Sequence, residues 1–99
     1  MRLRAAILGL VCACGTEGPE PEVRAVLPER AHPGETVEIR GRGFAGEGFV
    51  AFGTEVGTVL VWTDDRIRVM VPGMPSGITT VVVMVDGRQS QPERFEVQP

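Results

Sequence analysis

Side chains with nucleophilic or basic chemistry are few in this chain and stand far apart. The only histidine is His32, next to Pro33, and the only serines are Ser76 and Ser90. A Ser-His-Asp site needs a nucleophile and a base within hydrogen-bonding distance, and neither serine lies in the G-x-S-x-G pattern of a nucleophile elbow. Spacing alone leaves such a site open, but His32 beside a proline is typical of a surface turn. We therefore expect no catalytic residue and no enzyme activity.

Two other segments have part of a ligand-site pattern. Residues 41–48 contain four glycines around Phe44, but no lysine and no following helix, so turn glycines explain them better than a phosphate loop. Asp64 and Asp65 offer the oxygen ligands that calcium prefers, but a third spaced ligand is missing and aspartate is common in turns. We expect neither a metal nor a cofactor.

The two cysteines near the N-terminus indicate processing rather than catalysis. Residues 1–13 have a basic start followed by an apolar run, as in a secretory signal peptide, and are shorter than the roughly 20 apolar residues of a membrane helix. The stretch from Val11 to Cys14 resembles the bacterial lipobox, in which a small residue precedes the cysteine that is lipidated. Cys14 follows Ala13 and fits this role, whereas Cys12 follows the branched Val11. We expect lipidation of Cys14; an ordinary secreted protein is the alternative.

The residues after Cys14 have the composition of a tether. Residues 14–22 are acidic and rich in proline, with no apolar run to bury. At about 3.3 Å per extended residue, residues 15–22 reach at most roughly 26 Å from the anchor. The lipobox resemblance implies a lipid-anchored protein of the cell envelope. Because Gly15 and not aspartate follows the cysteine, it implies the outer membrane if the source is Gram-negative.

The rest of the chain has the pattern of one all-β domain over residues 23–98. A chain of 99 residues with 13 glycines and 8 prolines suits short strands joined by tight turns. Loop residues 72–77 suit a crossing between two sheets, Asp86-Gly87 predicts a two-residue hairpin, and Pro92 makes the last strand an edge or a bulged strand. Short apolar runs predict strands over residues 23–27, 36–40, 49–52, 56–62, 66–71, 78–85 and 88–97.

Charge argues against nucleic acid as a partner. The formal net charge is −3, and it becomes more negative once Arg2 and Arg4 leave with the leader. An acidic domain is a poor partner for phosphate backbones. The remaining arginines stand singly and often beside acids, as Arg40 does beside Glu38, which is typical of solvated strand faces.

The order of these signals resembles an IPT/TIG domain over about residues 22–98. The residues that carry the resemblance are Pro28, the run from Gly34 to Gly41 and Phe44, the run from Val50 to Gly53, the run from Ile67 to Pro72, Gly77 with Val81 and Val83, and Phe95 with Val97. The resemblance implies an immunoglobulin-like (E-set type) sandwich of two packed sheets. The basic loops that DNA-binding members use are missing here.

Two features remain as candidate contact sites. If Val81, Val83 and Val85 face the core, then Val82 and Met84 face outward. In the family topology Phe49 and Ala51 lie beside them, so an apolar outward stripe of Phe49, Ala51, Val82 and Met84 is expected, and such patches often mark contact surfaces. A covering loop or edge strand is the alternative. Trp62 is either a core residue at the end of a sheet or an exposed stacking platform for sugar or peptide.

These observations predict a non-catalytic module. The first hypothesis is a lipid-anchored envelope protein whose domain serves for protein–protein contact or spacing. The alternative is a carbohydrate-binding accessory module at the cell surface that uses Trp62 and the glycine loop.

Overall fold

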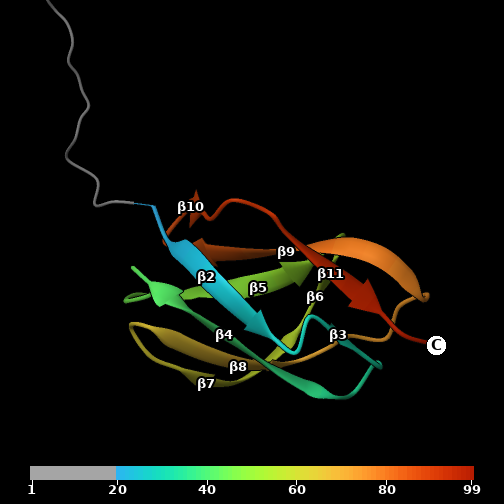
Figure 1. Ribbon diagram of the computed structural model, residues 1–99. Coiled ribbons are helices and arrows are strands. Elements are labelled where there is room, and N and C mark those ends of the chain that lie inside the picture. Colours follow the sequence, from blue (N-terminus) through green and yellow to red (C-terminus); the bar gives the residue numbers. More distant parts are fainter. Residues whose placement is uncertain (1–19) are drawn as a thin grey trace, which may run out of the picture.

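A computed structural model describes residues 20–99, whose strands form two facing sheets (Figure 1). The four-stranded sheet has the order β2 (Glu22–Leu27), β4 (Thr36–Arg42), β8 (Arg66–Met70) and β7 (Thr58–Trp62). The six-stranded sheet has the order β3 (Arg30–Ala31), β11 (Glu93–Val97), β9 (Gly77–Val85), β5 (Gly48–Phe52) and β6 (Glu55–Val56), and β10 (Arg88–Gln89) also pairs with β9. The all-β, immunoglobulin-like fold class is confirmed.

The leader and the lipidation site lie outside the described residues. These are the expected signal peptide over residues 1–13, Cys14, and the tether up to residue 19. Strand β2 begins at Glu22, which the composition had placed at the end of the tether. Within residues 20–99, no helix is long and apolar enough to cross a membrane.

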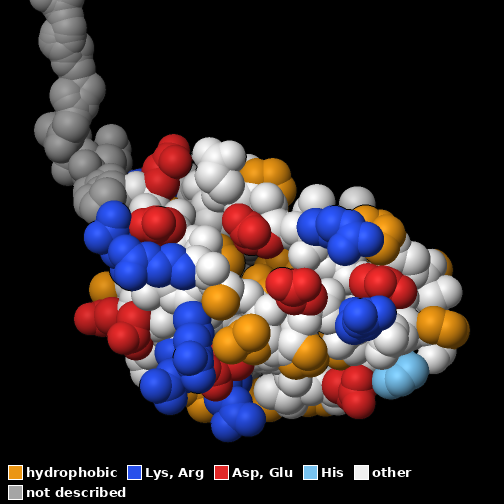
Figure 2. Space-filling view, viewed as in Figure 1, with side chains coloured by type: hydrophobic (Ala, Val, Ile, Leu, Met, Phe, Trp, Pro, Cys, Tyr) orange, Lys and Arg blue, Asp and Glu red, His pale blue; other side chains and the backbone are white. Residues whose placement is uncertain are grey.

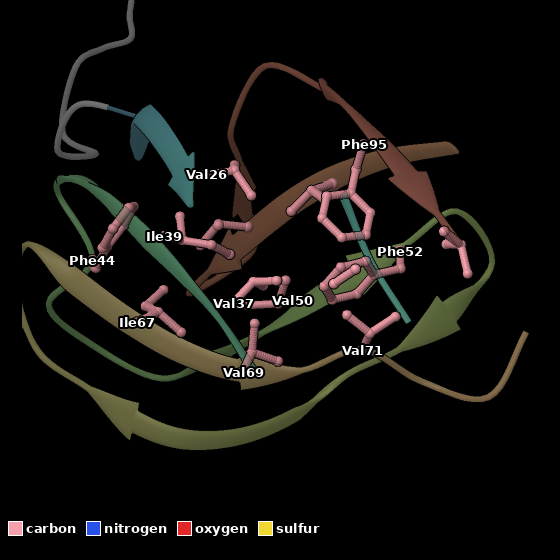
Figure 3. Close-up of a cluster of buried hydrophobic side chains, with 14 of the residues drawn as sticks. Val26, Val37, Ile39, Phe44, Val50, Phe52, Ile67, Val69, Val71 and Phe95 are labelled. Atoms are coloured by element: carbon pink, nitrogen blue, oxygen red, sulfur yellow. The ribbon is translucent and has the colours of Figure 1, made fainter. Parts of the chain in front are cut away.

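The core consists of the inward side chains of both sheets. On β4 and β8, Val37 pairs with Val69 and Ile39 with Ile67, and all four are buried. Figure 3 shows Phe44 at one end of this core and Phe52 with Phe95 at the other. The rings of Phe52 and Phe95 meet edge to face at 5.4 Å between centroids, a favourable aromatic geometry. The expected inward positions of Val81, Val83 and Val85 on β9 are confirmed.

The strand expected over residues 56–62 is in fact two strands in different sheets. Strand β6 pairs with β5, and β7 pairs with β8. The chain changes sheets at Gly57, where a Cβ atom would lie 2.6 Å from Cγ2 of Val69 and 2.9 Å from Cε1 of Phe52. Only glycine lets the backbone pass so close to the core, and a pattern of apolar residues does not reveal such a crossing.

The last strand is interrupted as Pro92 predicted, but it is not the edge of its sheet. Strands β10 and β11 both pair with β9, and the chain bulges between them. The buried hydroxyl of Ser90 accepts a hydrogen bond from the backbone N–H of Val83 (3.0 Å), which maintains the pairing at the bulge. The short strand β3, which the sequence did not predict, pairs in parallel with β11 and forms the edge instead.

The predicted turns are also present. Residues 71–76 carry the chain from β8 to β9, which lie in different sheets. Asp86 and Gly87 have φ values of 50° and 83°, as a primed hairpin turn requires. Asp86 is thus the one described residue other than glycine with a positive φ.

Candidate functional site

Strands β5 and β9 pair in the register that the outward stripe requires. Phe49 lies opposite Met84, and Ala51 lies opposite Val82. The alternate residues of β9, including Val81 and Val83, are fully buried. Because successive side chains of a strand point to opposite faces, the four stripe residues share the outer face of the six-stranded sheet.

One further residue extends this surface. Val56 on β6 lies opposite Ala51 and is 57% exposed, and Phe49 is 42% exposed. We call Phe49, Ala51, Val56, Val82 and Met84 the apolar face. Ala51, Val82 and Met84 are half-buried by their neighbours in the sheet. Among residues 20–99 the two sheets are the only layers, so no described strand covers the apolar face.

The border of the apolar face is polar. Gln89 lies opposite Met84, Arg94 lies opposite Thr80, and Glu96 lies opposite the exposed Ile78. An apolar centre with a polar rim is the usual composition of a protein interface. Sequence reasoning missed Val56, since it placed that residue in the same strand as Trp62.

Trp62 combines features of the two alternatives that the sequence left open, a core residue and an exposed stacking platform. It ends the edge strand β7, packs against the core, and is half-buried. Its indole Nε1 donates a hydrogen bond to the backbone carbonyl of Phe44 (2.7 Å). A hollow of about 450 Å³ lies beside it, lined by Gly46, Glu47, Gly48, Val59 and Trp62.

The glycine loop beside Trp62 is held in place by the β9–β10 hairpin. The backbone N–H of Glu47 donates to Oδ1 of Asp86 (3.2 Å), and the N–H of Asp86 donates to the carbonyl of Glu47 (2.8 Å). The indole N–H is satisfied within the protein. A ligand in the hollow would therefore meet ring surface and backbone more than a free indole donor.

The structure does not bring the nucleophilic and basic residues together. The ring nitrogen Nδ1 of His32 lies 2.8 Å from the carbonyl oxygen of Pro99, and its backbone N–H donates to Glu35. Ser90 is buried, and its hydroxyl accepts a hydrogen bond from the backbone N–H of Val83 and donates one to the carbonyl of Gln91. Ser76 is exposed in the loop before β9. Among residues 20–99, neither serine forms a hydrogen bond with the imidazole of His32.

Asp64 and Asp65 form a turn between β7 and β8. Their carbonyls accept hydrogen bonds from the backbone N–H groups of Phe44 and Gly41, and the Asp65 carboxylate accepts one from the hydroxyl of Thr63. In residues 20–99 no three His, Cys, Asp or Glu side chains are grouped as metal ligands.

The opposite outer surface, on the four-stranded sheet, is rich in arginine. Arg40 lies opposite Arg66, and Arg68 lies opposite Glu38. Arg42 and Arg24 contact Glu22 at the start of β2. We call Arg24, Arg40, Arg42, Arg66 and Arg68 the arginine face. Figure 2 shows basic side chains gathered over this part of the molecule, with acidic ones among them.

Glu38 lies in the middle of the arginine face. A hydrogen bond from Nε of Arg40 (2.5 Å) lowers the pKa of Glu38, and the charges of Arg40, Arg66 and Arg68 act in the same direction. Sequence reasoning treated these arginines as scattered. The alternation in β4 and β8 places each of them outward, but only the pairing of the two strands brings them together.

Comparison with known proteins identifies the family. Residues 21–97 match the family model of the IPT/TIG domain. The chain belongs to the IPT/TIG domain family. Among similar proteins, cyclomaltodextrin glucanotransferase of Bacillus sp. (strain 1011) is 40% identical over 72 residues, covering 69% of this chain and 10% of the enzyme. The same enzyme of Thermoanaerobacterium thermosulfurigenes is 38% identical over 58 residues, covering 58% of this chain and 8% of the enzyme.

Solved structures contain the same IPT/TIG fold. A gamma-CGTase from an alkalophilic Bacillus clarkii superposes with a TM-score of 0.77 at 31% identity, covering 86% of this chain and 13% of the enzyme. SGBP-B from a complex xyloglucan utilization locus in Bacteroides uniformis has a TM-score of 0.65 at 21% identity, covering 77% of this chain and 23% of SGBP-B. This chain thus spans about a tenth of the curated relatives above, in which an IPT/TIG-like segment is one part of a longer protein.

Proposed function

We propose that this chain is a non-catalytic binding or spacer module of the bacterial cell envelope, anchored through lipid on Cys14, and that the apolar face is its protein contact surface. The observation that carries the proposal is the alignment of Phe49 with Met84 and of Ala51 with Val82 on one open sheet face. Both alternating sets of β9 are largely apolar, and the sandwich core buries only one of them.

Burial of the second set supplies the driving force for contact. Removing apolar surface from water is worth about 25 cal/mol per Å², so a patch of a few hundred Å² contributes several kcal/mol before association costs. Phe49 and Met84 provide the largest side chains at one end, and Val56 and Val82 continue the surface.

Similar proteins support a binding role without chemistry. The matched segment is a small fraction of each glucanotransferase, and the described residues contain no paired nucleophile and base. A similarly folded structure from Bacteroides ovatus is described as an auxiliary nutrient binding protein, at 21% identity and a TM-score of 0.62. Binding by a module within or beside other domains is the role that fits these relatives.

Mass spectrometry of the membrane fraction tests the anchor. We expect acylated Cys14 as the first residue of the mature chain, because Ala13 precedes it at the processing site. A mature chain that retains Cys12, or one that begins after Cys14, would show that the lipobox interpretation is wrong.

Photo-crosslinking in native envelopes tests the contact surface. We expect a cross-linking residue at Phe49 to capture a protein, and the same residue at Leu60, an exposed apolar position on the other sheet, to capture none. The double substitution Val82→Thr/Met84→Gln should weaken capture from position 49, while Leu60→Gln/Val61→Thr should leave it unchanged. Both double variants should melt near the parent temperature.

The outcomes separate two kinds of failure. If Val82→Thr/Met84→Gln unfolds the domain, these side chains belong to the core. If that variant folds and capture persists, contact through the apolar face is refuted, whatever the state of Cys14.

Carbohydrate binding is the second candidate, because Trp62 lines a hollow beside the glycine loop. The described origin of SGBP-B in a xyloglucan utilization locus points in the same direction. A glycan array separates the two functions: sugar binding that is lost in Trp62→Ala and kept in Val82→Thr/Met84→Gln would favour the carbohydrate module. Circular dichroism must show that Trp62→Ala remains folded, since this residue also packs on the core.

A further inference from the structure

The charges of this domain are distributed unevenly. Residues 20–99 contain eight arginines and twelve carboxylates, so the described domain is acidic as a whole. Five of the eight arginines nevertheless lie on the arginine face, where Glu22 and Glu38 are the only carboxylates on the paired strands. The two adjacent acids, Asp64 and Asp65, lie in the turn at one end. The arginine face is therefore positive on a negative molecule.

The guanidinium groups on this face remain available to an outside ligand. The ion pairs of Arg24, Arg40, Arg42 and Arg66 with Glu22 or Glu38 are made through Nε, and among residues 20–99 their terminal Nη atoms make no hydrogen bond. The side chains of these four arginines are 56–69% exposed. Terminal guanidinium nitrogens in this state suit the oxygens of a phosphate group.

A shallow hollow lies among these arginines. It has a volume of about 310 Å³ and is lined by Arg24, Arg40, Gly41, Asp65 and Arg66. Arg40 and Arg66 are directly opposite on neighbouring strands, where like charges repel. Glu38 offsets this repulsion only in part, since it contacts Arg40 closely and Arg66 at 3.9 Å. An anion over this surface would relieve the remaining repulsion.

The position of the chain's entry into the domain indicates which anion is near. Strand β2, the edge strand of the arginine-bearing sheet, begins at Glu22, and Cys14 lies eight residues before it. Extended chain of that length reaches at most roughly 26 Å. In Figure 2 the basic side chains begin close to the point where the described chain starts. A membrane anchor at Cys14 would keep this face within reach of lipid headgroups.

We propose that the arginine face docks on the anionic phospholipid headgroups of the membrane that holds the anchor, which rests on the proposed lipidation of Cys14. The two sheets turn opposite faces outward, so this docking directs the apolar face away from the bilayer and toward a partner. The tether raises the local concentration of the domain at the membrane surface, and the arginines orient the domain relative to that surface.

Vesicle binding by the full chain, made by cell-free synthesis without acylation, tests this proposal. The probe is a pair of vesicles, phosphatidylcholine alone and phosphatidylcholine with phosphatidylglycerol, and the measurement is the ratio of the two partition coefficients by sedimentation. Each arginine near an anionic surface contributes about fivefold to binding, so Arg66→Gln/Arg68→Gln should lower this ratio about 25-fold. The leader is the same in every variant and cancels in the comparison.

A matched control separates the face from net charge. Arg30→Gln/Arg94→Gln removes the same charge from exposed positions on the other sheet and should leave the ratio close to that of the parent. Arg66→Lys/Arg68→Lys should keep most of the preference, since docking depends on positive charge. Thermal melts should show that all variants fold.

Three results would overturn the proposal. These are equal binding of the parent chain to both vesicles, an equal loss in both glutamine variants, and a ratio that Arg66→Gln/Arg68→Gln leaves unchanged. Binding to an acidic polysaccharide in place of the anionic vesicles would assign the arginine face to another ligand. None of these results depends on whether Cys14 is acylated in the cell, so lipidation can fail separately.

Discussion

The two outer faces of the sandwich differ although the inner faces are alike. Inside, both sheets present alternating valine, isoleucine and phenylalanine side chains that are almost completely buried. Outside, the paired strands β5 and β9 carry the apolar face, whereas the paired strands β4 and β8 carry four arginines and Glu38. The difference shows that folding constrains the inner residues and leaves the outer ones free for contact.

The comparison also separates two physical kinds of contact. An apolar face gains from burial against a matching surface and depends weakly on salt. A face with exposed guanidinium groups gains from nearby negative charge and is screened by ions. A module with both faces can hold two different surfaces at once.

The largest expected effect contrasts two phenylalanines of the same strand. Phe52 is fully buried and Phe49 is 42% exposed, and both lie on β5. Phe52→Ala should lower the free energy of unfolding by about 3–5 kcal/mol, because it removes a ring from a packed core. Phe49→Ala should cost less than about 1 kcal/mol. Urea unfolding of both variants measures the difference, and similar losses would show that the apolar face is part of the core.

The next largest effect is expected from salt, which should weaken binding by the arginine face but not binding by the apolar face. Raising the salt concentration from about 0.1 M to 1 M shortens the Debye length from about 10 Å to about 3 Å. The preference of the full chain for anionic vesicles should then fall by about tenfold, while capture from position 49 should be unchanged or stronger. Capture that falls with salt to the same degree would mean that charge, and not apolar burial, holds the partner.

Acid should weaken the arginine-bearing sheet by a small amount. The folded protein lowers the pKa of Glu38 below the ordinary glutamate value of 4.5, mainly through the hydrogen bond from Arg40. A lowered pKa stabilises the fold above that value, and the stabilisation is lost as pH falls below about 4.5. Melting temperatures from pH 7 to pH 3 should fall slightly less in Glu38→Gln than in the parent. A steeper fall in the variant would show that Glu38 does not stabilise this face.

No effect is expected from a chelator or a reductant. The span from residue 23 to 98 contains no cysteine, and the described residues hold no group of three metal ligands. The melting temperature should therefore be the same with and without EDTA or dithiothreitol. A fall of many degrees with EDTA would assign a calcium site to Asp64 and Asp65 and would place a metal beside the arginine face.

Local sequence patterns predicted much of this fold. The alternation of Val81, Val83 and Val85 predicted which side of β9 is buried, and Asp86-Gly87 predicted the hairpin from β9 to β10, because both depend on residues close together in the chain. The division of residues 55–62 between two sheets was not predicted. It depends on the room left at Gly57 by Val69 and Phe52, which are distant in sequence.

The candidate contact surfaces were likewise predicted only in part. The sequence by itself determined the all-β class and the outward positions of Val82 and Met84 within their strand, and the family resemblance added Phe49 and Ala51 as their neighbours. Only the tertiary structure decided that Val56 extends this stripe, that the Trp62 indole donates a hydrogen bond to the Phe44 carbonyl, and that Arg40 and Arg66 lie side by side. The physical reason is that period-two geometry fixes where a side chain points within its strand, whereas its neighbours depend on strand pairing over long sequence distances.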